Sequence, residues 1–297
     1  MGVWKALVAP TLGGKQLWAD VFARDGFCIQ RNVFGDHHRL LGPGDRRLAW
    51  GSFDDCLAAF DAAEREPWAD GTHVVLLLHG YLRAKDAFKP MTRALNDAGF
   101  AAVPINYPSM WRGLDAHSAQ LRGVLDGLQG RFTVSLVGHS MGGLIARQVL
   151  AQEGAWRENL TLNRLVMLGV PNQGAEMADR LSDWWLYRTL GGPASTQLTT
   201  SVVPDLPAPT VPFGNVAGVR GNGRGWNPLI PGEDDGIVTL ESTRMDGAED
   251  TLVLPCVHAL LMRHHRVIDA TLSYLRTGRF EAAVGDAEGV AAESLLG

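Results

Sequence analysis

The chain has 297 residues, of which 46% are hydrophobic and 20% are charged, and this is sufficient for one large folded domain with an appendage. Its formal net charge of −5 gives no broad basic surface, so the composition argues against nucleic acid as a partner. No stretch reaches the length of a membrane-spanning helix, and the first apolar run is too short for the core of a signal peptide. We therefore expect a soluble cytoplasmic protein, and the sequence leaves its oligomeric state open.

The three cysteines, Cys28, Cys56 and Cys256, are odd in number and far apart in the chain. Their spacing does not match a zinc site, and their number suits a reducing compartment. We therefore expect them to be small, buried, apolar side chains, and the sequence predicts neither a metal nor a cofactor.

Residues 1–70 carry few clear signals. The run 27–34 is typical of a strand, and Ser52 is a suitable cap for a short helix after it. We expect this N-terminal extension to add an outer pair of strands and a helix to the main sheet.

From residue 71 to residue 280, apolar runs alternate with helical patterns. The runs that read as strands are 74–78, 101–105, 132–137, 165–170, 211–219 and 251–254, and the helical patterns are 88–98, 114–128, a segment after Ser140, and 259–275. This alternation predicts an α/β fold, in which a mostly parallel, doubly wound sheet carries helices on both faces. In such sheets the reactive groups gather beyond the carboxyl ends of the strands.

Two segments depart from this pattern. Residues 176–207 contain Trp184, Trp185 and Tyr187, followed by prolines, which favours either a lid-like insertion over a site or an ordinary helix with buried tryptophans. Residues 281–297 are rich in alanine, glycine and glutamate, and we expect a mobile tail.

A G-x-S-x-G turn, Gly138-His139-Ser140-Met141-Gly142, lies between a predicted strand and a predicted helix. A serine at the tip of such a turn has a strained backbone, and the two glycines leave the space that the turn requires. The helix behind it directs amide N–H groups and the positive end of its dipole toward whatever the serine attacks. The turn therefore predicts Ser140 as a nucleophile.

A serine nucleophile needs a base, and histidine suits this role because its pKa is close to the working pH. In the doubly wound hydrolase architecture the chain order is serine, acid, histidine. His258 is the predicted base, because it follows Ser140 and lies just past the last predicted strand, whereas His264 and His265 fall inside the last predicted helix.

The acid that orients the base must come from a loop between Ser140 and His258. Asp235 is the preferred candidate, because Gly236 after it permits a tight turn and 237–238 anchors the loop in the core. Its neighbour Asp234 is the rival, and Asp205 is a distant third.

The oxyanion of an acyl-transfer intermediate requires two preorganised donors. One is predicted to be the backbone N–H of Met141, the residue after the nucleophile. The other is predicted in the loop after the strand 74–78, where the Tyr81 N–H follows His79 and Gly80.

Between about residue 73 and residue 280 the chain resembles the α/β-hydrolase superfamily, and within it bacterial triacylglycerol lipases and related carboxylesterases. The resemblance implies Asp235 as the acid, in agreement with the choice made from the residues. Some such lipases hold calcium through an aspartate shortly after the catalytic histidine, but residues 259–262 contain none, so we predict no calcium. The first 70 residues match no family pattern. The matching segments are Leu78-His79-Gly80-Tyr81, Val137-Gly138-His139-Ser140-Met141-Gly142-Gly143, Leu168-Gly169-Val170-Pro171-Asn172-Gln173-Gly174, Asp235-Gly236-Ile237-Val238 and His258.

These features predict a serine hydrolase that cleaves a small-molecule or lipid carboxylic ester through an acyl-enzyme. Two alternatives stay open. The same three residues would serve a thioesterase, an amidase or an acyltransferase. A hydrolase fold without activity, used as a binding module, is a third reading, although the presence of all three residue types argues against it.

Overall fold

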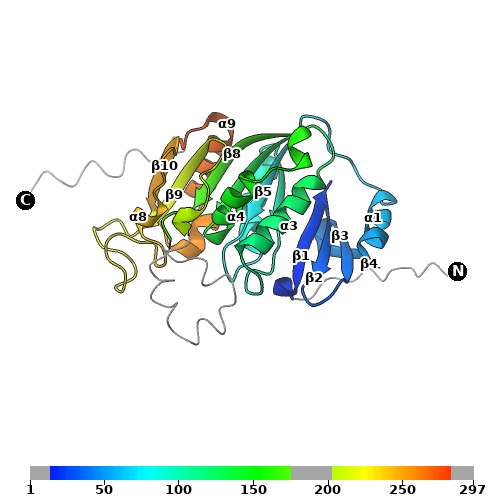
Figure 1. The fold of residues 1–297 in the computed structure, drawn as a ribbon. Coiled ribbons are helices and arrows are strands. Elements are labelled where there is room, and N and C mark those ends of the chain that lie inside the picture. The colour runs from blue at the N-terminus through cyan, green and yellow to red at the C-terminus, as the bar shows by residue number, and fades with distance from the viewer. Residues whose placement is uncertain (1–13, 175–202, 282–297) are drawn as a thin grey trace, which may run out of the picture.

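The computed structural model describes residues 14–174 and 203–281 of the chain. Within these residues two sheets lie side by side, one of six strands and one of four (Figure 1). The predicted lid at 176–207 falls outside the described residues except at its end, and so does the predicted tail apart from residue 281.

The larger sheet has the strand order β10-β9-β8-β7-β5-β6, and every neighbouring pair is parallel. The predicted α/β fold is therefore confirmed. The chain runs from β5 outward to the edge strand β6 and then back past β5 to β7, so the strand order reverses beside β5 and β7, where open sheets of this kind bind ligands. The strands are β5 (His73–Leu78), β6 (Ala101–Ile105), β7 (Phe132–His139), β8 (Leu160–Leu168), β9 (Phe213–Val219) and β10 (Asp250–Pro255).

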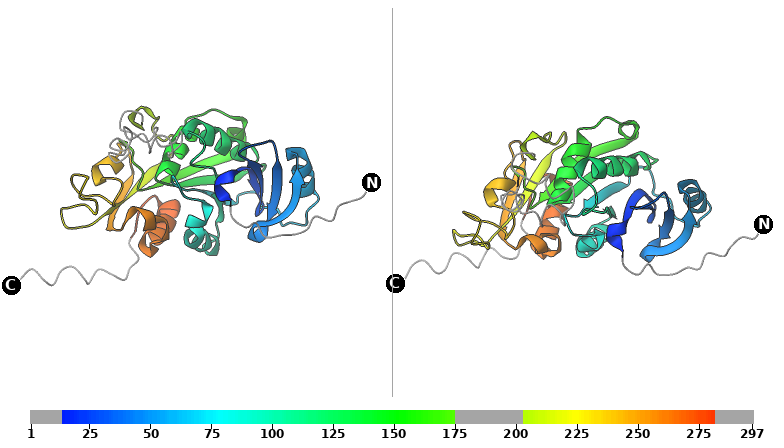
Figure 2. Two further views of the ribbon diagram at one scale, coloured as in Figure 1. Left: turned by 90° about the horizontal axis from the view of Figure 1, so that it is seen from below. Right: turned by 60° about the horizontal axis from the view of Figure 1, so that its bottom comes forward.

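Helices cover both faces of this sheet, because β5 and its neighbours have apolar side chains pointing to both sides. Along β5, Val74, Leu76 and Leu78 join the core beneath α3 (Leu114–Asp126) and α4 (Met141–Leu150). The alternate residues Val75 and Leu77 join the core beneath α2 (Lys89–Asp97) and α9 (His265–Thr277). Figure 2 shows these helices on the two sides of the strands.

The predicted last helix is divided in two. A 3₁₀ turn, η6 (His258–Arg263), comes first, and α9 begins only at His265. His264 precedes α9 in an extended conformation, at φ −71° and ψ 124°, and this breaks the helix. His258 therefore belongs to a tight turn directly after β10.

Residues 18–51 form a separate antiparallel sheet and do not extend the six-stranded sheet as the sequence predicted. The main sheet ends at β6, which carries Pro104 without an N–H to offer a further strand. The N-terminal strands pair with their sequence neighbours instead, beginning with β1 and β2, where Asp25 and Gly26 both have positive φ and make a two-residue hairpin turn. The strands of this sheet are β1 (Trp18–Arg24), β2 (Phe27–Asn32), β3 (His38–Gly42) and β4 (Arg46–Gly51).

The N-terminal sheet has its own small core and its own helix, α1 (Phe53–Asp61). Ser52 caps α1 as predicted, in a reciprocal capping box with Asp55. Phe60 packs from α1 against Phe22 and Phe27 of the sheet. This unit sits beside α3 at one end of the molecule, with β10 at the other end (Figure 1).

Candidate active site

Ser140 lies at the sharp turn between β7 and α4, with φ 53° and ψ −126°. This is a strained conformation for a residue with a side chain. A Cβ on Gly142 would come within 2.1 Å of the Leu78 carbonyl oxygen, and one on Gly138 within 2.4 Å of Gly143 Cα. The turn can form only with glycine at both positions. The Ser140 amide donates to the Leu168 carbonyl over 2.9 Å, which ties the turn to the end of β8.

His258 and Asp235 form a buried pair. His258 Nδ1 lies 2.7 Å from Asp235 Oδ2, and the His258 amide donates to the Asp235 carbonyl over 2.8 Å. The second carboxylate oxygen of Asp235 accepts from the amides of Ile237 (3.1 Å) and Val238 (2.8 Å). A carboxylate held on both oxygens keeps the proton of a neutral imidazole on Nδ1, and Nε2 is then the acceptor.

The neighbouring carboxylate serves a different purpose. Asp234 is fully buried, and its Oδ1 accepts from the amides of Asn227 (3.0 Å) and Gly236 (2.6 Å). It therefore fastens the loop that precedes Asp235. Asp205 is exposed in a short 3₁₀ turn (Val203–Asp205). Of the three acidic candidates, Asp235 is the one in contact with His258.

The residue before the nucleophile connects the serine turn to His258. His139 Nε2 donates to the His258 carbonyl over 3.0 Å, and the two ring centroids are 4.6 Å apart. A Cβ on Gly169, at the end of β8, would lie 3.1 Å from His258 Nδ1 and 3.2 Å from Asp235 Oδ2. The carboxyl ends of β7 and β8 and the loops after β9 and β10 thus converge at one point.

No hydrogen bond joins the Ser140 hydroxyl to His258 within residues 14–174 and 203–281. Contacts between a nucleophile and its base are often long without substrate and tighten in the complex. The hydrogen bond from the His139 ring to the His258 carbonyl, and that from the Ser140 amide to the Leu168 carbonyl, place the two residues at the same edge of the sheet.

Three other histidines near this edge are kept neutral. Burial lowers the pKa of His79 to about 4 and that of His117 to about 4, and it holds the pKa of His139 well below the usual value. His79 stacks on Tyr107 with a centroid distance of 3.9 Å, and Tyr107 also meets the ring of His117. These rings act as packing and hydrogen-bonding groups near neutral pH and add no positive charge beneath the serine.

The loop after β5 runs directly against the nucleophile. A Cβ on Gly80 would lie 3.1 Å from Ser140 Cβ and 2.9 Å from His139 Nδ1. Tyr81, the next residue, is half-buried against the core below α4, and Met141 is the first residue of that helix. The two backbone segments predicted to hold an oxyanion therefore both adjoin Ser140.

Sequence reasoning did not identify the residues that shape this loop. Leu82 has a positive φ of 58°, and its amide donates to the Ser109 hydroxyl over 3.1 Å. The Tyr107 hydroxyl donates to the His79 carbonyl. Their position in the sequence could have identified them, because Tyr107 and Ser109 follow directly after β6 and so lie at the same edge of the sheet as Ser140.

Within the described ranges, no group of three or more histidine, cysteine or acidic side chains is arranged to hold a metal ion. Cys28, Cys56 and Cys256 are free thiols; Cys56 and Cys256 are buried and Cys28 is partly so. In the same part of the chain, no helix has the length and apolar character needed to cross a bilayer.

Comparison with known proteins gives the same fold. Residues 75–270 match the model of the Alpha/beta hydrolase family. The mature form of the Bacillus licheniformis lipase BlEst2 superposes with a TM-score of 0.53 at 20% identity, covering 71% of this chain and 92% of that chain. The metagenomic carboxyl esterase MGS0156 superposes with a TM-score of 0.53 at 16% identity, covering 66% of this chain and 68% of that chain. No curated protein matches the sequence.

Proposed function

Because the chain belongs to the alpha/beta hydrolase family, we propose that it is a serine hydrolase that cleaves carboxylic esters through an acyl-enzyme intermediate. Ser140 is the proposed nucleophile, His258 the base and Asp235 the residue that orients the base. The amides of Met141 and Tyr81 are the proposed donors to the oxyanion.

In this mechanism Ser140 Oγ attacks the ester carbonyl carbon while His258 Nε2 takes the hydroxyl proton. The carbonyl oxygen becomes an oxyanion, which accepts hydrogen bonds from the two amides. Collapse of the intermediate breaks the ester C–O bond, and His258 returns the proton to the leaving alcohol. A water molecule then attacks the acyl-enzyme by the same route and releases the carboxylic acid.

The observation that carries this proposal is the 2.7 Å contact between His258 Nδ1 and Asp235 Oδ2, next to a serine with φ 53°. A buried carboxylate on Nδ1 sets the tautomer that a general base requires and stabilises the imidazolium that forms when it accepts a proton. A histidine with a purely structural role would not account for the strained serine turn at the same edge of the sheet.

Esters are the favoured substrate class because the two superposed neighbours are described as a lipase and a carboxyl esterase. Leu82, on the loop beside Ser140, is 58% exposed, which suits contact with an apolar acyl or alcohol group.

The test combines covalent labelling with turnover. We expect a fluorophosphonate probe to label the wild-type protein and p-nitrophenyl esters to be hydrolysed, and we expect Ser140→Ala to lose both. A matched panel of ester, thioester and amide substrates on one preparation checks the bond that is cleaved. Faster turnover of thioesters or amides would replace the ester proposal, and absence of labelling would indicate a binding module.

A further inference from the structure

The loop beside the nucleophile is strained and needs external support. Leu82 has φ 58°, a conformation that is unfavourable for a residue with a side chain and persists only where its surroundings enforce it. Within the loop, the Arg83 amide donates to the Gly80 carbonyl over 3.2 Å. Because Leu82 is strained, contacts from outside the loop are needed to hold residues 80–83 in this conformation.

Gln16, outside the hydrolase sheet, supplies those contacts. Its Nε2 donates to the Arg83 carbonyl over 2.6 Å. Its Oε1 accepts from the Ser109 hydroxyl and from the Met110 amide, each over 3.3 Å. The same Ser109 hydroxyl accepts from the Leu82 amide over 3.1 Å, so Gln16 and Ser109 together hold the strained residue from both sides.

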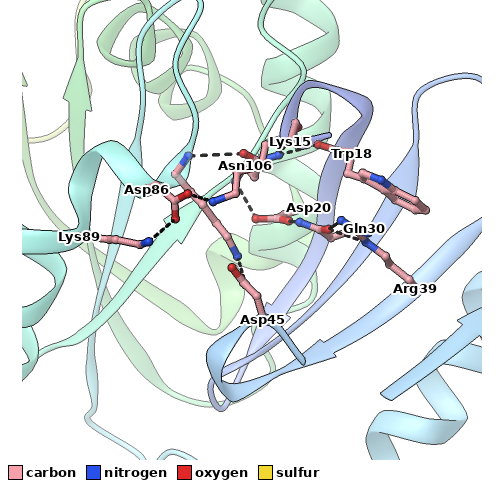
Figure 3. A network of polar contacts seen from close by, with 10 residues as sticks. Lys15, Trp18, Asp20, Gln30, Arg39, Asp45, Asp86, Lys89 and Asn106 are labelled. Carbon is pink, nitrogen blue, oxygen red and sulfur yellow. Dashed lines mark hydrogen bonds and ion pairs between the residues drawn. The ribbon is translucent and has the colours of Figure 1, made fainter. Parts of the chain in front are cut away.

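Gln16 is itself fixed, since it lies in the short 3₁₀ turn η1 (Lys15–Leu17) just before β1. The side-chain amide of Asn106 donates to the carbonyls of Lys15 and Trp18, both over 2.7 Å, and so grips this turn at its two ends (Figure 3). The backbone amide of Asn106 donates to the carboxylate of buried Asp20, on β1, over 2.7 Å.

The support continues into the N-terminal sheet. Gln30 of β2 donates to Asp20 over 2.5 Å, and the guanidinium of Arg39, on β3, donates to Gln30 Oε1 over 2.7 and 2.9 Å (Figure 3). Lys85, just past the loop, pairs with Asp45 in the connection between β3 and β4 over 2.5 Å. A continuous set of polar contacts thus links three strands of this sheet to Leu82 and Arg83 of the loop, and a separate ion pair holds Lys85 just past it.

We propose that the N-terminal sheet braces the loop that carries Tyr81, and that Gln16 is the positioning residue at the end of this brace. The inference rests on the proposed function, because it assigns residues 14–51 a part in stabilising the oxyanion. Gln16 acts through the Arg83 carbonyl and the Ser109 hydroxyl, and not by touching the substrate.

The first experiment replaces the amide by a side chain of similar length. In Gln16→Met the loop loses its tether, and we expect kcat for p-nitrophenyl butyrate to fall about 10- to 100-fold while KM stays within about twofold, since the oxyanion is absent from the bound ester and develops only in the transition state and the tetrahedral intermediate. Gln152→Met is the matched control, because half-buried Gln152 bonds Ser118 Oγ over 2.8 Å elsewhere in the fold. Wild-type kcat in Gln16→Met would overturn the proposal.

A second variant pair tests the route. Ser109→Ala removes the hydroxyl between Gln16 and Leu82, and we expect the double variant Gln16→Met/Ser109→Ala to be little slower than Gln16→Met alone, as for two parts of one tether. Effects that multiply would show that the two residues act separately. If Gln16→Met does not fold, Gln16→Glu is the second variant, because it keeps the side-chain length and places a carboxylate against the Arg83 carbonyl. We expect the same fall in kcat, and a wild-type kcat would again overturn the proposal.

The two proposals fail in distinguishable ways. A wild-type protein without fluorophosphonate labelling and without hydrolysis contradicts the proposed function. A wild-type protein that hydrolyses esters, together with a Gln16→Met variant of unchanged kcat, contradicts only the brace.

Discussion

His139 and His258 are joined by a hydrogen bond of 3.0 Å, from the Nε2 of the residue before the nucleophile to the backbone carbonyl of the residue proposed as the base. Their rings lie 4.6 Å apart. Because burial keeps His139 neutral, its ring can donate from one nitrogen without bringing a competing charge to His258.

This contact predicts the effect of His139→Phe, which keeps an aromatic ring and removes the donor. We expect kcat to fall about tenfold or more, because the 258 turn is no longer fixed to the serine turn. His73→Phe is the control. His73, the first residue of β5, is half-buried and forms a hydrogen bond with Ser135 Oγ of β7, away from the carboxyl ends of the strands where Ser140 lies. Ester kinetics and thermal unfolding of both variants check this, and equal loss of kcat in the two would count against it.

The contacts of Asp235 and Asp234 predict that replacing the first lowers kcat and replacing the second lowers stability. Asp235→Asn replaces the acceptor on His258 Nδ1 and disturbs the tautomer, so we expect kcat to fall about 10³- to 10⁴-fold with the fold retained. Asp234→Asn weakens the contacts to Asn227 and Gly236, so we expect a lower melting temperature and a much smaller loss of kcat. Parallel kinetics and unfolding curves decide between the two residues, and the reverse order would assign the acid to Asp234.

The geometry of the serine turn predicts that a methyl group added at Gly142 is not tolerated. A Cβ at residue 142 would meet the Leu78 carbonyl oxygen at 2.1 Å, and both are parts of the rigid backbone. We expect Gly142→Ala to lower the free energy of unfolding by about 2 kcal/mol or more and to abolish turnover. Gly35→Ala, where a Cβ meets nothing within 4 Å, should stay within about 0.5 kcal/mol of wild type in urea unfolding. A stable, active Gly142→Ala protein would refute the geometry of the turn.

The buried histidines predict acid sensitivity. His79 and His117 have folded-state pKa values of about 4, below the ordinary value of 6.5, so below about pH 6.5 the unfolded chain binds protons that the folded rings do not. Stability is therefore full above that pH and falls as the pH drops toward 4, by about 1.4 kcal/mol per pH unit for each ring. Urea unfolding at several pH values measures this slope.

The slope can be assigned to one ring. His117→Phe keeps the contact with Tyr107 and cannot titrate, so we expect a shallower loss of stability between pH 6.5 and pH 4.5. Gly35→Ala, which removes no titratable group and meets nothing within 4 Å, should keep the wild-type slope. An unchanged slope in His117→Phe would mean that other groups cause the acid sensitivity.

Much of the fold could be predicted from local pattern. Apolar runs such as 74–78 and the glycine-flanked Ser140 carry their structural signal within a few residues, because strand and turn geometry depend on neighbouring side chains. Residues at strand ends could also be recognised as a group, since parallel strands bring their carboxyl ends to one edge.

The sequence by itself determined the α/β alternation, the serine turn and the set of candidate partners, since each depends on periodicity and on backbone restrictions near one residue. Only the tertiary structure showed which of Asp234 and Asp235 contacts His258, because adjacent side chains point in different directions and the path of the loop sets which one meets the ring. It also showed that β1 to β4 form a sheet of their own and that Gln16 reaches Arg83, 67 residues away, since such contacts depend on how whole sheets pack.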